Sequence, residues 1–413
     1  MHTTDVIIIG AGQAGLAMSR HLTTRAIDHV VLERGRVGER WRTERWDSLR
    51  LLTPNWMSRL PNWSYRGPEP EGYMTATEFV SYLRRYADDF DAPVEHDAAV
   101  ESVRIAGDRY EVISAGGTWH ASNVVIATGW ADRPAIPSFA RHLSPDIHQV
   151  APSSYRNPAV LPDGGVLVVG ASATGVQLAD ELRAAGRDVI LAVGRHSRLP
   201  RRYRGMDIFW WLERIGKFDE SIDEMPDPVK ARHAPSLQLV GRPGNPSLDL
   251  VTLHEAGVRL TGRVCTADGH RLDVADDVCD MSAAADRKMR RVLAEIDRHV
   301  DLTGLNAEVL PAAPIRSLPR LRAVGRIDLR AAGITTVVWA TGHRRTYPWI
   351  SVPVRDEAGE IRQSRGVTPA PGLYVLGQRF QHFRNSNFID GVGRDAAFVA
   401  HHLTTRLARA ARP

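Results

Sequence analysis

The sequence predicts an α/β fold in which two similar strand–turn–helix units lie in one chain. A glycine-rich turn occurs twice between an apolar run and a helical pattern, at 6–15 and at 166–175. An Ala-Thr-Gly segment also occurs twice after a short apolar run, at 127–129 and at 340–342. The length of 413 residues suffices for two domains. Together these observations predict two Rossmann-like dinucleotide-binding domains.

The small residues in both turns have the spacing of a pyrophosphate-binding site. The first small residue permits a tight turn, the second lets a phosphate approach the backbone, and the third lets helix and strand pack closely. The phosphate charge then lies at the amino end of the helix. The residues that we expect to contact the two dinucleotides are Gly10, Gly12, Gln13, Ala14 and Gly15 in the first turn and Gly170, Ser172, Ala173 and Thr174 in the second.

The residue after the next strand distinguishes the two dinucleotides. Glu33, beside Arg34, follows the apolar run 30–32, and a carboxylate there accepts hydrogen bonds from ribose hydroxyls and repels a 2′-phosphate. FAD or NAD(H) suits this first site. Arg195 follows the run 189–194, with Arg198 and Arg202 close behind, and guanidinium groups there favour NADPH. The alternatives are an ordinary surface acid and a solvated basic loop.

The order of the motifs predicts that the second domain is inserted into the first. We expect the two Ala-Thr-Gly segments to mark the crossings between domains, with Thr128, Gly129, Thr341 and Gly342 close to the cofactors. Prolines follow the first crossing and precede the second. The expected FAD domain comprises 1–150 and 326–413, and the expected NADPH domain comprises 151–325. The strand expected at 373–376, followed by Gly377, completes the first domain.

Local patterns predict several further elements. Apolar residues at helical spacing after a capping threonine predict a helix over 75–87, and a second helix is expected at 207–215. A Gly-Gly turn separates two expected strands at 109–113 and 117–120. A third strand is expected at 124–126.

Bulk composition excludes several classes of protein. An apolar content of 43% with no long apolar run fits a globular chain without a membrane span, and the absence of a signal-peptide pattern predicts a cytoplasmic location. Much of the positive excess in the net charge of +5 lies around 195–204. Because nucleic-acid binding requires a broader basic surface, we expect no nucleic-acid partner. We expect a monomer or homodimer and no metal site.

The two cysteines exclude a disulfide reductase. Cys265 and Cys279 are the whole complement, and they lie fourteen residues apart in a region that we expect to be irregular. An enzyme that passes electrons from a flavin to a disulfide needs a closely spaced cysteine pair beside the ring. Both residues are expected to be structural.

The chain resembles the class B flavin-dependent monooxygenases, in particular their bacterial CzcO-like branch. The resemblance covers nearly the whole chain, and several motifs carry it besides the two turns. Gly38-Glu39-Arg40-Trp41 is similar to a Gly-Gly-x-Trp stretch along the flavin, which implies that Arg40 and Trp41 contact the cofactor. The segment 73–83 resembles a family helix, 372–377 resembles the closing flavin strand, and 199–205 with 209–211 suits the CzcO-like branch.

The resemblance implies an FAD monooxygenase that uses NADPH and O2. Such enzymes form a C4a-(hydro)peroxyflavin and pass oxygen to a small molecule, here by N- or S-oxygenation rather than carbonyl oxidation. In the family's linker signature an aromatic residue follows a histidine by four positions. Neither His148 nor Tyr155 fits, because Pro152 and Ala151 occupy the complementary slots. An oxidoreductase or oxidase without oxygen transfer and a redox-sensing regulatory flavoprotein therefore stay open.

A few further residues are candidates for the active site. Asn55 is the expected catalytic polar group, by resemblance to an asparagine near the flavin, and a turn asparagine is the alternative. Trp210, Phe383 and Asn385 are expected to line the substrate pocket, although Trp210 also suits a core position. Asp390 precedes the last helix and is expected to contact the flavin.

Overall fold

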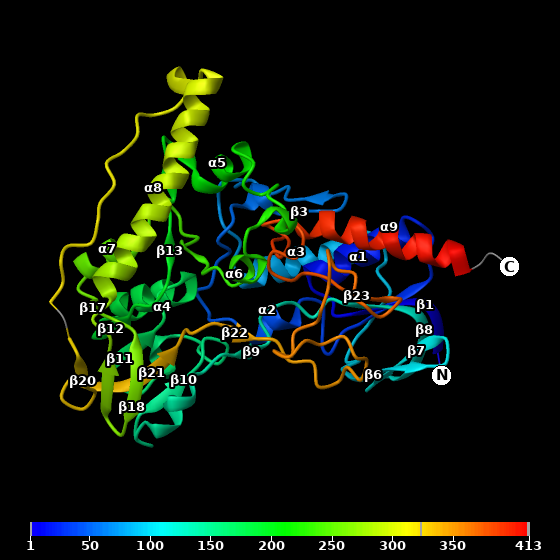
Figure 1. The fold of residues 1–413 in the computed structure, drawn as a ribbon, viewed down its shortest axis with the longest axis horizontal. Helices are drawn as coiled ribbons and strands as arrows, with labels where there is room; N and C mark the ends of the chain where they lie inside the picture. Colours follow the sequence, from blue (N-terminus) through cyan, green and yellow to red (C-terminus); the bar gives the residue numbers. More distant parts are fainter. Residues whose placement is uncertain (1, 323, 411–413) are drawn as a thin grey trace.

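The computed structural model describes residues 2–322 and 324–410. Two groups of elements lie on either side of a central region crossed by α2, β9 and β22, and helix α8 projects from one of them (Figure 1). The helices of the described part are α1 Gln13–Thr23, α2 Glu39–Thr43, α3 Ala76–Asp88, α4 Ala173–Ala184, α5 Ile208–Arg214, α6 Pro228–Arg232, α7 Leu250–Glu255, α8 Val278–Thr303 and α9 Val392–Ala410. None of the helices described is long and apolar enough to span a bilayer.

The first group is built on a seven-stranded sheet of order β5-β2-β1-β8-β7-β6, with β23 also paired to β8. Its strands are β5 Val94–Glu95, β2 His29–Leu32, β1 His2–Ile9, β8 Gly117–Ile126, β7 Arg109–Ser114, β6 Val100–Ala106 and β23 Leu373–Val375. Strands β5, β2, β1, β8 and β23 pair in parallel, whereas β6 and β7 form an antiparallel meander beside β8.

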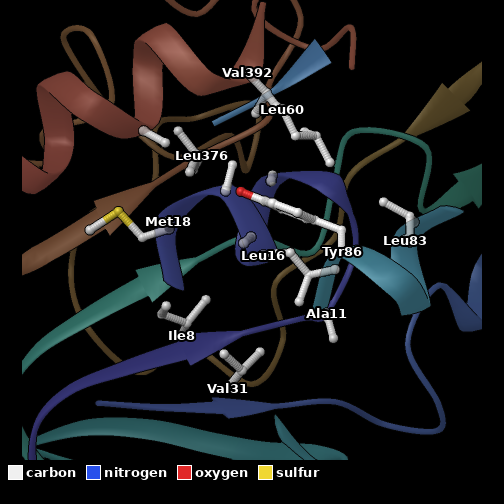
Figure 2. Packing of buried hydrophobic residues seen from close by; sticks show 14 of the residues in the cluster. Ile8, Ala11, Leu16, Met18, Val31, Leu60, Leu83, Tyr86, Leu376 and Val392 are labelled. Carbon is white, nitrogen blue, oxygen red and sulfur yellow. The ribbon is translucent and has the colours of Figure 1, made fainter. Parts of the chain in front are cut away.

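Alternate residues of β1 pack on opposite faces of this sheet. Ile8 points into a cluster with residues of α1, α3 and α9, among them Leu16, Leu83 and Val392 (Figure 2). Ile7 and Ile9 pack on the other face with the meander and with a loop around Ile350. Because both faces are covered, the strand is apolar throughout Val6–Ile9, as is typical of parallel sheets.

The second group is built on a parallel five-stranded sheet of order β10-β21-β11-β12-β17. Its strands are β10 His148–Val150, β21 Ile334–Trp339, β11 Gly165–Val169, β12 Val189–Ala192 and β17 Arg259–Thr261. Val168 faces a cluster that includes α4 and α7, and Leu167 faces the opposite cluster. The opposite cluster includes residues of a three-stranded sheet, β18 Val264–Asp268, β19 Arg271–Val274 and β20 Arg326–Asp328.

Short pairs of strands complete the architecture. They are β9 Arg133–Pro134 with β22 His343–Arg344, β3 Arg59–Leu60 with β4 Trp63–Ser64, β13 Ser197–Arg198 with β16 Leu237–Gln238, and β14 Arg202–Tyr203 with β15 Met206–Asp207. The antiparallel pair of β9 and β22 joins the two segments that directly follow the Ala-Thr-Gly repeats. The two expected crossings therefore run side by side between the sheets.

Several local predictions are confirmed. Helix α3 begins after Thr75, whose side chain forms a capping box with Glu78, and it covers the predicted 75–87. Helix α5 and strands β7 and β23 also lie where they were predicted.

The structure corrects three predictions. The strands predicted at 117–120 and 124–126 are one strand, β8, because it pairs with β1 from Trp119 to Ile126. The limits at 150/151 and 325/326 are too narrow for the second sheet, since β10 and β21 belong to it and β20 packs beside it. The cysteine region is regular: Cys265 lies in β18 and Cys279 in α8.

Candidate functional site

A first cavity of about 360 Å³ opens at the carboxyl ends of β1, β2 and β8. The predicted cofactor residues that line it are Gly10, Gly12, Gln13, Ala14, Glu33, Arg34, Arg40, Trp41, Thr128, Gly129 and Gly377. These residues come from five separate stretches of the chain, which the parallel sheet brings to one edge. The position agrees with the rule that ligands of open α/β sheets bind outside the carboxyl ends of the strands.

The glycines of the first turn have three distinct roles. Gly10 has φ +105°, and a Cβ there would lie 2.9 Å from the carbonyl oxygen of Ala127. A Cβ on Gly15 would overlap the carbonyl oxygen of Gly10, so this glycine permits helix α1 to pack against the turn. Gly12 differs, because a Cβ there would meet no described atom within 4 Å and would project into open space. Only Gly12 is therefore available for close approach by a ligand.

Helix α1 offers its amino end to the first cavity. Its N-cap is Gly12, which has no side chain to cap the free N–H groups of the first turn. Gln13 and Ala14 in that turn line the cavity. Free N–H groups and the positive end of the helix dipole together suit a phosphate group.

Glu33 is held firmly at the end of β2. Its carboxylate accepts hydrogen bonds from the backbone N–H groups of Ala11, at 2.7 Å, and Gly35, at 3.2 Å. The side chain is buried but lines the cavity. Its position and remaining acceptor capacity fit the binding of ribose hydroxyls.

Basic and aromatic groups close the other side of the first cavity. Trp41 packs edge-on against Phe79 at 4.8 Å between ring centroids, and the Arg45 guanidinium lies 4.8 Å from the Trp41 ring centroid. Burial lowers the pKa of Arg45 to about 10, and Glu44 acts in the opposite direction. Arg40 pairs with Glu44 at 3.2 Å and Asp132 at 3.4 Å. Arg45 therefore adds a half-buried positive charge beside Trp41.

A second cavity of about 410 Å³ lies at the carboxyl ends of β11, β12 and β21. The predicted residues that line it are Gly170, Ser172, Ala173, Thr174, Arg195, Thr341 and Gly342. Gly170 has φ +108°, and a Cβ there would overlap the carbonyl oxygen of Ala340. Each glycine turn thus packs against its own Ala-Thr-Gly segment, so the two cavities share one construction.

Only Arg195 of the predicted basic cluster lines the second cavity. Arg198 is instead buried, where it pairs with Asp249 at 2.5 Å and Asp286 at 2.7 Å. Arg202 lies outside the cavity and donates to the carbonyl oxygen of Gly205. The structure therefore does not support the predicted phosphate contacts of Arg198 and Arg202, because one guanidinium is used within the core and the other in a local turn.

The two cavities adjoin. Trp130 and Arg345 line both of them, directly after the first Ala-Thr-Gly segment and directly after β22. The ring of Trp130 packs edge-on against His343 at 5.8 Å between centroids, and Arg379 lies 5.0 Å from the Trp130 ring centroid. Ligands in the two cavities would therefore meet near Trp130.

Asn55 and Asp390 lie away from both cavities. Asn55 is buried; its amide donates to the carbonyl oxygen of Glu69 at 2.9 Å and accepts from the N–H of Met74 at 2.9 Å. Both ends of the amide therefore hold a loop, as expected of a turn asparagine. Asp390 pairs with Arg59 at 2.6 Å. Their positions do not support the catalytic and flavin-contacting roles.

The predicted substrate-pocket residues also lie outside both cavities. Trp210 packs on Trp211 at 4.7 Å between centroids, beside a core cluster formed with α8. Phe383 lies under Arg394, with 3.8 Å between guanidinium carbon and ring centroid. Asn385 is buried and donates to Asp390 at 3.3 Å. All three are accounted for by packing within the protein.

Five arginines are among the cavity residues that were not predicted, namely Arg45, Arg133, Arg232, Arg345 and Arg379. Each lies in an irregular segment or at the end of a short element, distant in sequence from the glycine turns. A surplus of arginine over acidic residues in 341–346 and 379–384 was the available signal. Position in the fold was required to bring them together.

Comparisons with known proteins agree with this geometry. Residues 7–210 match the family described as "Pyridine nucleotide-disulphide oxidoreductase". An "Uncharacterized oxidoreductase CzcO-like" of Geobacillus kaustophilus is 32% identical, over 97% of this chain and 99% of the relative. A "Probable indole-3-pyruvate monooxygenase YUCCA4" of Arabidopsis thaliana is 29% identical, over 43% of each chain. The structure of a flavin-containing monooxygenase from Stenotrophomonas maltophilia superposes with a TM-score of 0.68 at 19% identity, over 98% of this chain and 100% of that chain.

Proposed function

Because the chain belongs to the class B flavin-dependent monooxygenase family, in its CzcO-like branch, we propose that it uses FAD and NADPH to transfer oxygen from O2 to a small molecule. Members of this family are flavin-dependent oxidoreductases with a nicotinamide partner. The observation that carries the proposal is the pair of adjoining cavities, each built on a glycine turn and sharing Trp130 and Arg345.

The first cavity is the proposed site of FAD. The N–H groups at the amino end of α1 would bind the pyrophosphate, and Gly12 would allow its close approach. Glu33 would accept hydrogen bonds from the adenosine ribose. Trp41 and Arg45 would lie along the rest of the cofactor. The bound flavin would supply hydride acceptance and reaction with O2.

The second cavity is the proposed site of NADPH. The turn 170–174 would bind the pyrophosphate, and Arg195 at the end of β12 would bind the 2′-phosphate. The shared wall at Trp130 would bring the nicotinamide end towards the first cavity. We propose that the segment spanning β10 to β21 is the NADPH domain and that the two remaining parts of the chain form the FAD domain.

N- or S-oxygenation is the proposed chemistry. Carbonyl oxidation in this family is associated with a tryptophan in the linker slot. Here Pro152 occupies that slot when His148 is aligned, and Pro152 itself lines the second cavity. His148 is exposed on β10, away from both cavities. These positions support a linker that differs from that of the carbonyl-oxidising enzymes.

The test is a product balance in the FAD-loaded full chain. NADPH consumption, O2 consumption, oxygenated product and H2O2 are measured together over a panel of thioethers, amines and ketones. The proposal predicts oxygenated product from a thioether or amine with less than one H2O2 per NADPH. Stoichiometric H2O2 with every compound would instead indicate an oxidase without oxygen transfer.

A further inference from the structure

Three arginines gather where the two cavities adjoin. Arg232 ends helix α6, Arg345 follows β22, and Arg379 follows Gly377; we call them the junction arginines. All three line the second cavity, and Arg345 lines the first as well. Burial lowers the pKa values of Arg232 and Arg379, and the charge of Arg345 lowers both further. The charge of Arg345 therefore lies close enough to act on both of the other guanidinium groups.

Acidic groups do not balance this charge. Arg345 pairs with Glu360 at 2.6 Å, and Glu360 also lines the second cavity. Within residues 2–322 and 324–410, neither Arg232 nor Arg379 forms an ion pair, and the Nε of Arg232 is buried without a hydrogen-bond partner. The negative charge of Asp223 raises the pKa of Arg232, but Asp223 forms its ion pair with Arg365, at 2.5 Å. A surplus of positive charge faces the junction.

The phosphates of the dinucleotide have other partners in the proposed site. In that proposed site the pyrophosphate would lie at the turn 170–174 and the 2′-phosphate at Arg195, so neither would require the junction arginines. Arg379 also lies over Trp130, which lines both cavities. A ligand held there would border both the Trp130 ring and the guanidinium groups. Planar guanidinium groups bind a carboxylate through paired hydrogen bonds.

We propose that the junction arginines bind the carboxylate of an organic-acid substrate where the two cavities meet. This inference rests on the proposed function and adds the substrate class to it. The carboxylate would offset the repulsion among the arginines and place the remainder of the substrate beside Trp130. Neutral analogues could not form charge-assisted hydrogen bonds with Arg232 and Arg379, which form no ion pair among the described residues, and would bind weakly.

The experiment titrates benzoate and benzamide into the oxidised FAD-loaded full chain at saturating NADP+. Equilibrium dialysis gives the dissociation constant, and flavin difference spectra report proximity to the cofactor. We expect benzoate to bind at least about tenfold more tightly than benzamide, as for a charge-assisted pair. The variants Arg232→Gln and Arg379→Gln should each weaken benzoate by about tenfold or more, while the matched control Arg344→Gln, exposed on β22 and outside both cavities, should leave it unchanged.

Several results would overturn the proposal. They are equal binding of benzoate and benzamide, no benzoate binding, or unchanged affinity in both arginine variants. In a parallel titration without NADP+, benzoate binding that saturating NADP+ then abolishes would assign the arginines to the dinucleotide instead. The comparison of benzoate with benzamide in the unmodified protein still decides the matter if a variant fails to fold. Because the titration involves neither O2 nor turnover, its failure is distinguishable from a failure of oxygen transfer.

Discussion

Arg195 lies on the wall of the second cavity, at the point where a 2′-phosphate would distinguish NADPH from NADH. Neighbouring arginines of the basic run form ion pairs within the protein. Arg198 pairs with Asp249 and with the buried carboxylate of Asp286, and Arg201 is wholly buried beside Asp207. Selectivity for NADPH should therefore depend on one arginine rather than on the net charge of the run.

We predict that Arg195→Gln raises the KM for NADPH about 10- to 100-fold, as expected for loss of a charge-assisted contact, and changes the KM for NADH little. Steady-state kinetics with both dinucleotides measures the effect. Arg202→Gln is the matched control, because Arg202 is exposed and lies outside the cavity. Equal changes for NADPH and NADH would contradict a 2′-phosphate contact.

Asp395, in the first turn of α9, predicts a pH-dependent stability. Burial raises its pKa to about 7, with Ser386 and Arg394 acting weakly in the opposite direction. As pH rises, the carboxyl group of Asp395 loses its proton near pH 4 in the unfolded chain but only near pH 7 in the folded chain. The free energy of unfolding therefore falls as pH rises from about 4 to about 7. Asp395→Asn removes this loss. In urea unfolding of the apoprotein, the variant should gain about 2.5 kcal/mol over the unmodified protein between pH 5 and pH 8. A constant difference would show that Asp395 does not titrate there.

At the scale of single residues, sequence reasoning worked where a motif fixes the backbone and failed where it did not. Glu33 and Arg195 follow strands whose ends the glycine turns define. Asn55 was placed by resemblance and Asp390 by its position before the last helix. Their hydrogen-bond partners are Glu69 and Met74 for Asn55 and Arg59 for Asp390. No local sequence pattern predicts hydrogen-bond partners that lie so far away in the chain.

At the scale of elements, the turn between β1 and α1 contains one glycine that is needed for folding and another that is expected to serve ligand binding. Gly15 packs against the turn itself, whereas Gly12 borders open space. Gly15→Ala should destabilise the apoprotein by about 1–3 kcal/mol or more through steric overlap. Gly12→Ala should leave apoprotein stability within about 1 kcal/mol and lower FAD affinity at least about tenfold, because its methyl group would enter the phosphate site. Urea unfolding and flavin titration measure the two effects; the same pattern in both variants would be evidence against the phosphate site.

Arg198 joins three elements through buried ion pairs. It extends from β13 to Asp249, the N-cap of α7, and to Asp286 in α8. Removing one partner of a buried pair leaves uncompensated charge, so Arg198→Met should lower the free energy of unfolding by about 3–5 kcal/mol. The preference for NADPH over NADH in the surviving folded protein should not change. A stable variant with an altered preference for NADPH over NADH would indicate that Arg198 does contact the 2′-phosphate.

Helix α8 illustrates why some elements escaped prediction. Its charged residues lower the mean hydropathy, and only one stripe, which includes Met289, Leu293, Ile296 and Val300, is buried. That stripe packs against α5, an element distant in sequence. By contrast, α3 was predictable because its cap and its apolar spacing lie within one short segment.

At the scale of the whole molecule, two parallel sheets with one construction bring two cavities together. The duplicated turns predict both sheets and both cavities. They do not predict the shared wall, because Trp130, Arg345 and Arg379 come together only through the β9–β22 pair and the loop after β23. The domain limits were misplaced for a related reason. Strand β21 pairs with β11, and β10 pairs with β21, so both belong to the second sheet. No local sequence pattern predicts these pairings.

The central claim is that FAD and NADPH occupy adjoining cavities and together activate O2. The most direct test reduces the FAD-loaded full chain with NADPH under anaerobic conditions, mixes it with O2, and follows the flavin spectrum by stopped flow. The account predicts rapid reduction by NADPH, and then a delayed return of the oxidised spectrum through a distinct oxygen-dependent intermediate spectrum. Slow reduction by NADPH, or immediate reoxidation with stoichiometric H2O2, would contradict it.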